Sequence, residues 1–240
     1  MTKWDQKAKN YSRYSEDKER FENLIFDALK AINIEFDNKI LLDIGCGTGV
    51  YTLHLAKKCL HIDAIDSSKE MLSLLDKDAN MLGLTNIDTI HTDWNSFTCK
   101  DKYDYAFCTM SPAIRKDEDL EKMTNCANTK IYLGWAGKRE THIIESLFEA
   151  HGSVYTPPNG ALKVKNWLSK NNKFFKVIPF DEEKIRKRKF DEAVENFEWH
   201  LEVRGLKPNA NKIKTILENF RDKEDFITEK TINHFNLIVW

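Results

Sequence analysis

Three glycines, Gly45, Gly47 and Gly49, stand within five residues of one another in the stretch LLDIGCGTGVYTLHLA. Branched apolar residues precede them and a helical pattern follows, so the glycines are expected in a strand-to-helix turn. Glycine accepts left-handed backbone angles, and amides at a helix start are open to a ligand. The turn therefore predicts a binding site for a small molecule.

Two carboxylates narrow the choice of ligand. Asp43 directly precedes the glycines, and Asp66 ends the next strand pattern, about 20 residues beyond the first glycine, where an acid meets a ribose in this topology. Asp43 would repel a pyrophosphate but attract an amino group. The G-x-G-x-G spacing also differs from the G-x-G-x-x-G of dinucleotide sites. A cationic, phosphate-free nucleoside fits this pattern better than a dinucleotide, although a plain strand-to-helix connection remains the alternative.

Alternating strand and helix patterns must position these residues. Strands are expected at 39–44, 61–66, 86–93, 103–110, 129–136, 173–180 and 232–240. Helices are expected at 18–32, 50–58, 67–83, 141–152, 161–170, 189–205 and 209–220, and Ser67 or Ser68 can cap the third of these. This rhythm predicts an α/β fold with a doubly wound, mainly parallel sheet.

The segments LLDIGCGTG, AIDSSKEML and HTDW together resemble the motif series of class I S-adenosylmethionine-dependent methyltransferases, over roughly residues 39–136. The resemblance implies a Rossmann-like sheet of seven strands with the seventh antiparallel, and S-adenosyl-L-methionine as cofactor. It implies that the turn from Asp43 to Gly49 holds the methionine part and that Asp66 holds the ribose. The cofactor-binding residues expected in full are Tyr14, Asp43, Gly45, Cys46, Gly47, Gly49, Asp66, Ser67, Met71, Asp93, Trp94 and Thr109.

Several of these residues have a simpler interpretation as packing residues. By the same resemblance Ser67 and Met71 would flank the adenine, with Asp93 and Trp94 on its other side. Met71 lies on the apolar face of its expected helix, so a core position is equally compatible. Trp94 could also be a packing residue, and Cys46 fits the turn simply because it is small.

The acceptor is less well specified than the cofactor. Relatives that methylate base amines or glutamine resemble one another in an Asp or Asn, two prolines and an aromatic residue after the fourth strand, whereas this chain has CTMSPAIRK. We expect Tyr11, Ser111, Arg115 and Trp135 to contact the acceptor. No catalytic residue is assigned, because a sulfonium carries its own leaving group and transfer needs mainly an in-line approach.

The 240 residues are expected to form one methyltransferase domain. Residues 1–37 would supply a lid and a helix, and residues 38–136 the cofactor-binding core. Residues 181–226 would form a helical insert between the last two strands that caps the acceptor side, or an interface for a second subunit. The oligomeric state is left open.

Composition favours a small-molecule acceptor over nucleic acid. The net charge is −1 and the pI is near 6.7, and the run KIRKRK at 184–189 directly follows acidic residues, as is usual for a solvated face. Without a signal or membrane-spanning pattern, a cytoplasmic location is expected. No metal site is expected, and the five cysteines (Cys46, Cys59, Cys99, Cys108 and Cys126) are expected as reduced thiols.

Three alternatives to a small-molecule methyltransferase stay open. The first is an RNA or protein methyltransferase, which shares the cofactor motifs. The second is an NAD(P)-dependent oxidoreductase with the same general fold. The third is a non-catalytic module that binds the cofactor within a complex.

Overall fold

The computed structural model describes residues 3–17, 20–99 and 102–240, and its contacts group into two compact units. Unit 1 comprises Met1–Gly134, Gly160–Pro179 and Asn236–Trp240, and unit 2 comprises Trp135–Asn159 and Phe180–Phe235. The prediction of a single methyltransferase domain stays a prediction.

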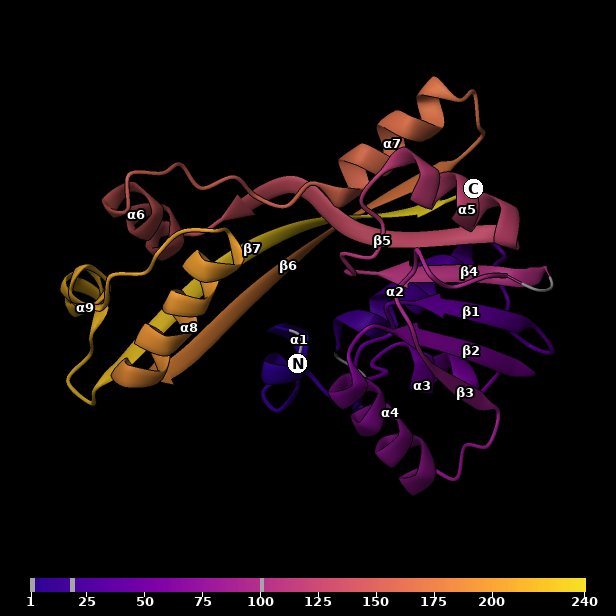
Figure 1. Cartoon of the computed structure of the whole chain (residues 1–240), viewed down its shortest axis with the longest axis horizontal. Helices are drawn as coiled ribbons and strands as arrows, with labels where there is room; N and C mark the ends of the chain where they lie inside the picture. Colours follow the sequence, from indigo (N-terminus) through magenta and orange to yellow (C-terminus); the bar gives the residue numbers. More distant parts are fainter. Residues whose placement is uncertain (1–2, 18–19, 100–101) are drawn as a thin grey trace. The chain divides into compact units, whose positions relative to one another are not determined.

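Seven strands form one sheet in the order β3-β2-β1-β4-β5-β7-β6, and Figure 1 shows their course. The strands are β1 (Ile40–Ile44), β2 (His61–Asp66), β3 (Ile87–His91), β4 (Tyr103–Thr109), β5 (Ala127–Glu140), β6 (Lys176–Lys189) and β7 (Phe226–Val239). The pairs β1–β2, β1–β4, β2–β3 and β4–β5 are parallel. Lys130 and Trp240 exchange backbone hydrogen bonds in both directions, a pattern of antiparallel pairing. The sheet is therefore mixed, with β7 antiparallel to β5.

Helices cover both faces of the sheet in unit 1. The helices of the chain are α1 (Lys3–Ala8), α2 (Phe21–Ala31), α3 (Thr52–Ala56), α4 (Lys69–Met81), α5 (Asp117–Cys126), α6 (His142–Ala150), α7 (Gly160–Lys170), α8 (Phe190–Val203) and α9 (Ala210–Leu217). Leu42 and Ala106 share a buried cluster with residues of α5 and α7. On the other face, Phe107 of β4 lies 5.8 Å from the ring of Tyr51, which contacts Phe26 of α2. Among the helices of the described residues, none combines the length and the apolar composition that a membrane span requires.

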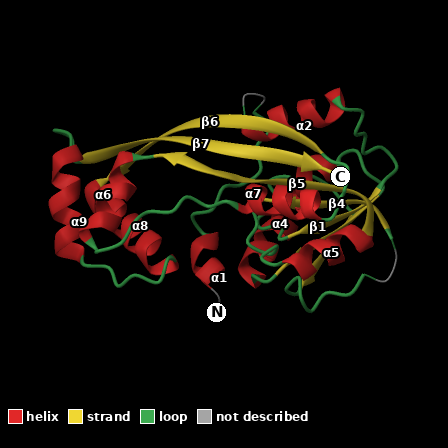
Figure 2. Cartoon of the chain, turned by 90° about the horizontal axis from the view of Figure 1, so that it is seen from above, coloured by secondary structure: helices red, strands yellow, loops and turns green. Residues whose placement is uncertain are grey.

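Unit 2 has a separate apolar core. Its helices α6, α8 and α9 bury side chains against one another and against β7, namely Ile143, Ile144, Leu147, Phe148, Phe190, Ala193, Val194, Phe197, Leu201, Ile213, Leu217 and Ile227. Figure 2 shows these helices beside the carboxyl end of β6 and the amino end of β7. The helices α8 and α9 stand between β6 and β7 in the chain. Helical structure there begins at Phe190, because the residues before it belong to β6.

The last three strands are longer than the sequence patterns indicate. β6 reaches Lys189 rather than residue 180, and β7 begins at Phe226 rather than at 232. Charged residues fill the added part of β6, so the apolar alternation that marks a strand is weak there. The basic run 184–189 was expected on a solvated face, and it lies within this strand.

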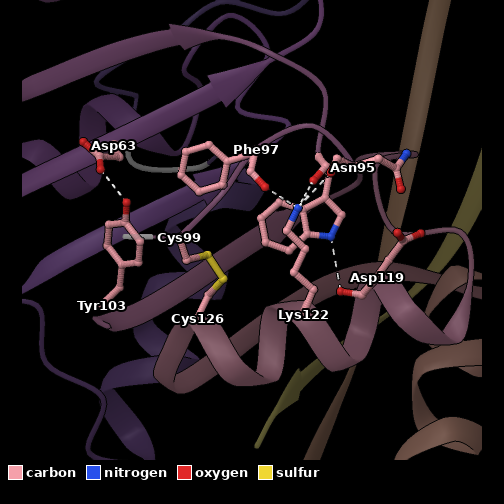
Figure 3. The surroundings of a disulfide bond; sticks show 9 residues. Asp63, Asn95, Phe97, Cys99, Tyr103, Asp119, Lys122 and Cys126 are labelled. Carbon is pink, nitrogen blue, oxygen red and sulfur yellow. Dashed lines mark hydrogen bonds between the residues drawn. A yellow bond between two sulfur atoms is a disulfide. The ribbon is translucent and has the colours of Figure 1, made fainter. Parts of the chain in front are cut away.

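A disulfide joins Cys99, in the loop after β3, to Cys126 at the end of α5, with their Cα atoms 5.8 Å apart (Figure 3). The expectation of five reduced thiols is wrong for this pair, because the fold brings together cysteines 27 residues apart. Lys122 strengthens the same connection, since its ammonium donates to backbone carbonyls of the loop, among them that of Phe97. Cys59 remains a free thiol, and burial raises its pKa to about 11.

Candidate cofactor site

The glycine turn has left-handed backbone at all three glycines. The φ angles are +70° at Gly45, +56° at Gly47 and +79° at Gly49, a region that side chains disfavour. The amides of Gly45 and Cys46 both donate to the carbonyl of Ile65, at 2.8 and 3.1 Å. The turn is thereby fastened to the end of β2, beside the predicted ribose acid.

Two of the glycines also leave no room for a side chain. A Cβ on Gly45 would lie 1.9 Å from the hydroxyl oxygen of Ser111, and one on Gly49 would lie 2.2 Å from a methyl carbon of Leu75. Both separations are far below van der Waals contact. The first contact also places the loop after β4 directly against the glycine turn, and acceptor binding by Ser111 stays a prediction.

Asp43 is the most unusual polar group of the turn. Its side chain is 1% exposed, and one carboxylate oxygen accepts a hydrogen bond from the Thr52 hydroxyl at 2.6 Å. The other oxygen is buried and has no hydrogen-bond partner within the described chain. Burial, with a smaller contribution from Asp66, raises the pKa of Asp43 to about 7. A buried carboxylate with an unpaired oxygen favours a cationic donor beside it.

Thr52 was missed by the sequence reasoning. The sequence signal that could have indicated it is a hydroxyl at the start of the helix that follows the glycines. In the structure this residue begins α3 and is fully buried.

Asp66 lies at the same turn. Its carboxylate accepts from the amide of Gly47 at 2.9 Å and from the amide of Ser68 at 2.8 Å. Burial raises its pKa, and these backbone hydrogen bonds oppose the rise. Since each carboxylate oxygen has two lone pairs, both can still accept from a ribose hydroxyl. Ser68, rather than Ser67, caps α4 by accepting from the Met71 amide.

The amino-terminal segment contacts the same turn. Thr48 donates its hydroxyl to the carbonyl of Ser12 at 2.5 Å, and the Ser68 hydroxyl donates to Asp5 at 2.6 Å. The ring of Tyr11 comes within 4.0 Å of a Cβ placed on the middle glycine. Residues 5–12 thus lie beside the turn and the start of α4. Sequence reasoning named Tyr11 but missed Asp5, Ser12 and Thr48.

Tyr14 and the predicted adenine residues on α4 have other surroundings. The Tyr14 ring lies 4.6 Å from that of His54, and its hydroxyl accepts from Lys57 at 2.6 Å, so Tyr14 is packed against α3. Met71 is 2% exposed in the core, and Ser67 is exposed just before the helix. Adenine contact by Met71 and Ser67, and cofactor binding by Tyr14, stay predictions.

Asp93 and Trp94 follow β3 and differ in burial. Asp93 is exposed and accepts from the amide and hydroxyl of Ser96, both at 3.0 Å. Trp94 is 3% exposed, and its indole donates to the carbonyl of Asp119 at 3.2 Å. The Lys122 ammonium sits 4.4 Å from the centre of its ring. These contacts favour a packing role for Trp94, and adenine binding stays a prediction for both residues.

The loop after β4 begins with strained backbone. Thr109 ends the strand half-buried, and Met110 has a φ of +51° while its amide donates to Leu133 at 2.8 Å. Such strain in a non-glycine residue often accompanies functional sites. Farther along, Arg115 donates to the carbonyl of Pro112 at 2.8 Å. It borders a cavity of about 320 Å³ between this loop and α7, lined also by Ile114, Lys116, Lys163, Val164, Trp167 and Lys170.

Trp135 and Cys46 are the remaining predicted site residues, and their roles at the site stay predictions. Trp135 belongs to unit 2, where its ring lies 4.7 Å from that of Phe235. Burial, with Asp43 and Asp66 nearby, raises the pKa of Cys46 well above its usual value, so its thiol stays protonated.

His61, Asp63 and Asp88 place potential metal-ligating atoms within 4.8 Å of one another. The Tyr103 hydroxyl donates to Asp63, as Figure 3 shows.

Comparison with known proteins identifies the family. Residues 41–129, which include the glycine turn, Asp43 and Asp66, match the family model described as a methyltransferase domain. These residues form a methyltransferase domain of the class I S-adenosylmethionine-dependent type. The cofactor of this family is S-adenosyl-L-methionine, whose amino acid part carries an ammonium group. The residues of this methyltransferase fit that cofactor, because the unpaired oxygen of Asp43 can accept from the ammonium.

Individual relatives match parts of the chain. The methyltransferase is 29% identical to an uncharacterized protein of Haemophilus influenzae over 152 residues, covering 62% of this chain and 55% of that protein. It is 37% identical over 70 residues to a probable (S)-tetrahydroprotoberberine N-methyltransferase of Papaver bracteatum, covering 28% and 20% of the two chains. The chain thus spans about half of the first relative and a fifth of the second.

A solved structure supports the fold of the methyltransferase. A precorrin-6y C5,15-methyltransferase of Geobacter metallireducens superposes with a TM-score of 0.55, at 9% identity, covering 96% of this chain and 94% of the other.

Proposed function

We propose that this methyltransferase transfers a methyl group from S-adenosyl-L-methionine to a small-molecule acceptor. The observation that carries the proposal is the buried, unpaired oxygen of Asp43 beside three left-handed glycines. An uncompensated buried carboxylate destabilises a protein. Its presence next to a turn that contains three glycines is explained if a cationic ligand supplies the missing partner.

The residues of the turn would hold the cofactor as follows. Asp43 accepts from the ammonium, the glycines allow close backbone approach, and Asp66 accepts from the ribose hydroxyls. Ser67, Met71, Asp93 and Trp94 are the proposed adenine neighbours. The bound cofactor supplies an electrophilic methyl group on a sulfonium, so the chain needs chiefly to orient the acceptor and exclude water.

The amino-terminal segment would act as a lid on this site. Its contacts with Thr48 and Ser68, and the position of Tyr11, lie at the turn and at the start of α4. A cofactor held beneath this segment would be shielded from water, which strengthens its interaction with the Asp43 carboxylate. We therefore expect removal of residues 1–17 to weaken cofactor binding.

The loop after β4 supports an acceptor of small size. It abuts Gly45 at Ser111 and continues into the cavity of about 320 Å³, a volume at the lower end of small-molecule pockets. The names of two relatives also denote small-molecule methylation, the Papaver N-methyltransferase and a probable cobalt-precorrin-6B C(15)-methyltransferase of Methanococcus vannielii.

The proposal is tested with the purified chain, radiolabelled S-adenosyl-L-methionine and a cell extract separated into small-molecule and macromolecular fractions. We expect label in the small-molecule fraction. Label confined to RNA or protein would instead support the macromolecular alternative. Saturable NADH binding without S-adenosyl-L-methionine binding would support an oxidoreductase.

A further inference from the structure

The basic run at 184–189 lies in strand β6, and this determines which way its side chains point. Because side chains alternate between the faces of a strand, Lys184, Arg186 and Arg188 share one face of β6 while Lys187 points to the other. Arg188 contacts Glu229 of β7, which fixes that face as the one that also carries Glu229. The run is therefore divided between two surfaces of unit 2.

The two faces differ in charge balance. On the first face, Arg188 and Arg139 share one carboxylate, Glu229, with nitrogen-to-oxygen distances of 3.3 and 3.9 Å. Lys184 pairs with Glu182 at 2.7 Å. No hydrogen bond or ion pair joins Arg186 to another described residue.

This arginine face, defined as Arg139, Glu182, Lys184, Arg186, Arg188, Glu229 and Asn233, thus holds four cations and two carboxylates. Burial, and then the neighbouring charge of Arg188, lower the pKa of Arg186.

Buried polar atoms without partners lie on the same face. Glu229 is 3% exposed and Asn233 is 4% exposed. The Arg139 Nε, the Asn233 Oδ1 and the Glu229 Oε1 are all buried without a hydrogen-bond partner in the described chain. The Asn233 amide nitrogen donates to Glu182 at 3.2 Å, which fixes the orientation of the amide. An unused cationic donor and an unused acceptor therefore occur on one partly desolvated surface.

We propose that the arginine face of unit 2 binds a small anionic molecule, a hydroxylated carboxylate or phosphate. The anion would accept from Arg186 and from the free Arg139 nitrogen, because guanidinium groups match carboxylate and phosphate oxygens. A hydroxyl of the ligand would donate to the Asn233 oxygen. Glu229 forms ion pairs with Arg188 at 3.3 Å and with Arg139 at 3.9 Å, so two positive charges face its single negative charge.

Nucleic acid fits this surface less well than a small molecule. Phosphate backbones are bound by stripes of exposed cations. On the opposite face, however, Lys187 lies 3.2 Å from Asp222 and 3.4 Å from Glu224, and Lys230 lies 3.0 Å from Glu183. These acids neutralise the lysines that a stripe would need, and only the arginine face keeps an excess of positive charge.

The test is titration calorimetry of the full chain with citrate and with inorganic pyrophosphate, in a buffer free of other polyvalent anions. We expect saturable binding of at least one probe to the wild type. Arg186→Gln should weaken it at least tenfold, and Arg186→Lys should restore part of it. Arg186 is partly exposed to solvent and forms no hydrogen bond or ion pair with another described residue, so this variant should fold, and circular dichroism checks that it does.

Lys187→Gln is the matched control, since it removes a neighbouring charge from the other face and should leave binding unchanged. Absence of saturable binding by both probes would overturn the proposal, as would an equal loss in the two glutamine variants. Tight binding of a single-stranded RNA that depends on Lys187 as much as on Arg186 would also overturn it. Binding of S-adenosylhomocysteine should be the same in all these variants, so a failure here leaves the proposed function untouched.

Discussion

The glycine turn of unit 1 and the arginine face of unit 2 carry partly buried charges of opposite sign. The turn concentrates negative charge, with Asp43 and Asp66 both partly or fully desolvated. The arginine face concentrates positive charge around a single buried glutamate, Glu229. Each leaves a buried polar atom without a partner. The difference shows that one chain offers separate environments for a cationic and for an anionic group.

The largest effect on the difference between the two regions is expected when the charge of Asp43 is removed. Asp43→Asn keeps the shape of the side chain but removes its charge, and loss of a buried charged partner typically weakens binding by about 2–5 kcal/mol. We expect S-adenosylhomocysteine to bind this variant at least thirtyfold more weakly, about 2 kcal/mol, by calorimetry at pH 8. Citrate binding should not change.

The same variant should be more stable than the wild type without ligand. The pKa of Asp43 is raised from 3.8 to about 7 in the folded state, so its ionisation reduces stability progressively as the pH rises through that range. At pH 8 the thermal midpoint of Asp43→Asn should therefore exceed that of the wild type. An equal or lower midpoint together with undiminished binding would rule out this account of Asp43.

The disulfide allows the two units to be perturbed separately, because all five cysteines belong to unit 1. A bond that closes a loop of this size stabilises by about 3–4 kcal/mol. We expect reductant to lower the free energy of unfolding by that order in urea titrations. Citrate binding at the arginine face should be the same with and without reductant.

A double variant, Cys99→Ser with Cys126→Ser, is the control for the disulfide. It should reproduce the loss of stability and should no longer respond to reductant. If reductant destabilises the double variant as much as the wild type, the effect does not come from this bond.

A methyl group added at Gly45 probes the shape of the turn rather than its charge. Gly45→Ala places a Cβ 1.9 Å from Ser111 in a left-handed backbone, and a displacement of about 1 Å in a binding site can cost about a hundredfold. We expect S-adenosylhomocysteine affinity to fall by that order. Gly83→Ala is the matched control, because Gly83 is also left-handed but has nothing within 4 Å of its Cβ position.

The pH dependence of cofactor binding tests the same carboxylate without any substitution. Protonation of Asp43 competes with a cationic ligand, so S-adenosylhomocysteine affinity should be level above pH 7 and fall below it. Between pH 7 and 5 the decline should approach about tenfold per unit. An affinity that stays constant down to pH 5, measured by calorimetry, would show that the ionised Asp43 contributes nothing to binding.

The glycine turn could be predicted from sequence because its parts are contiguous. Gly45, Gly47, Gly49 and Asp43 lie within seven residues, and their strand-to-helix context is visible in the same stretch. The partners that complete the turn are distant in the chain. Ser111 was named only through its place after a strand, and the contact of Thr48 with Ser12 has no local signal.

The arginine face could not be predicted in this way. Its residues come from β5, β6 and β7, and the added half of β6 is so rich in charge that its strand character depends on pairing with β7. The same limit applies to the disulfide, since nothing local links Cys99 with Cys126. Strand pairing and loop closure are non-local, and sequence periodicity does not report them.

The central claim is that the buried Asp43 carboxylate binds the ammonium group of the cofactor. A titration of this carboxyl group tests the claim most directly. Carbon-13 NMR of aspartate-labelled chain, with Asp43→Asn to assign the signal, would follow the carboxyl from pH 4 to 9 without ligand and with saturating S-adenosylhomocysteine. We predict a pKa of about 7 without ligand and a value well below it in the complex, because the ammonium favours the carboxylate. A pKa near 3.8 without ligand, or one that the ligand leaves unchanged, would contradict the account.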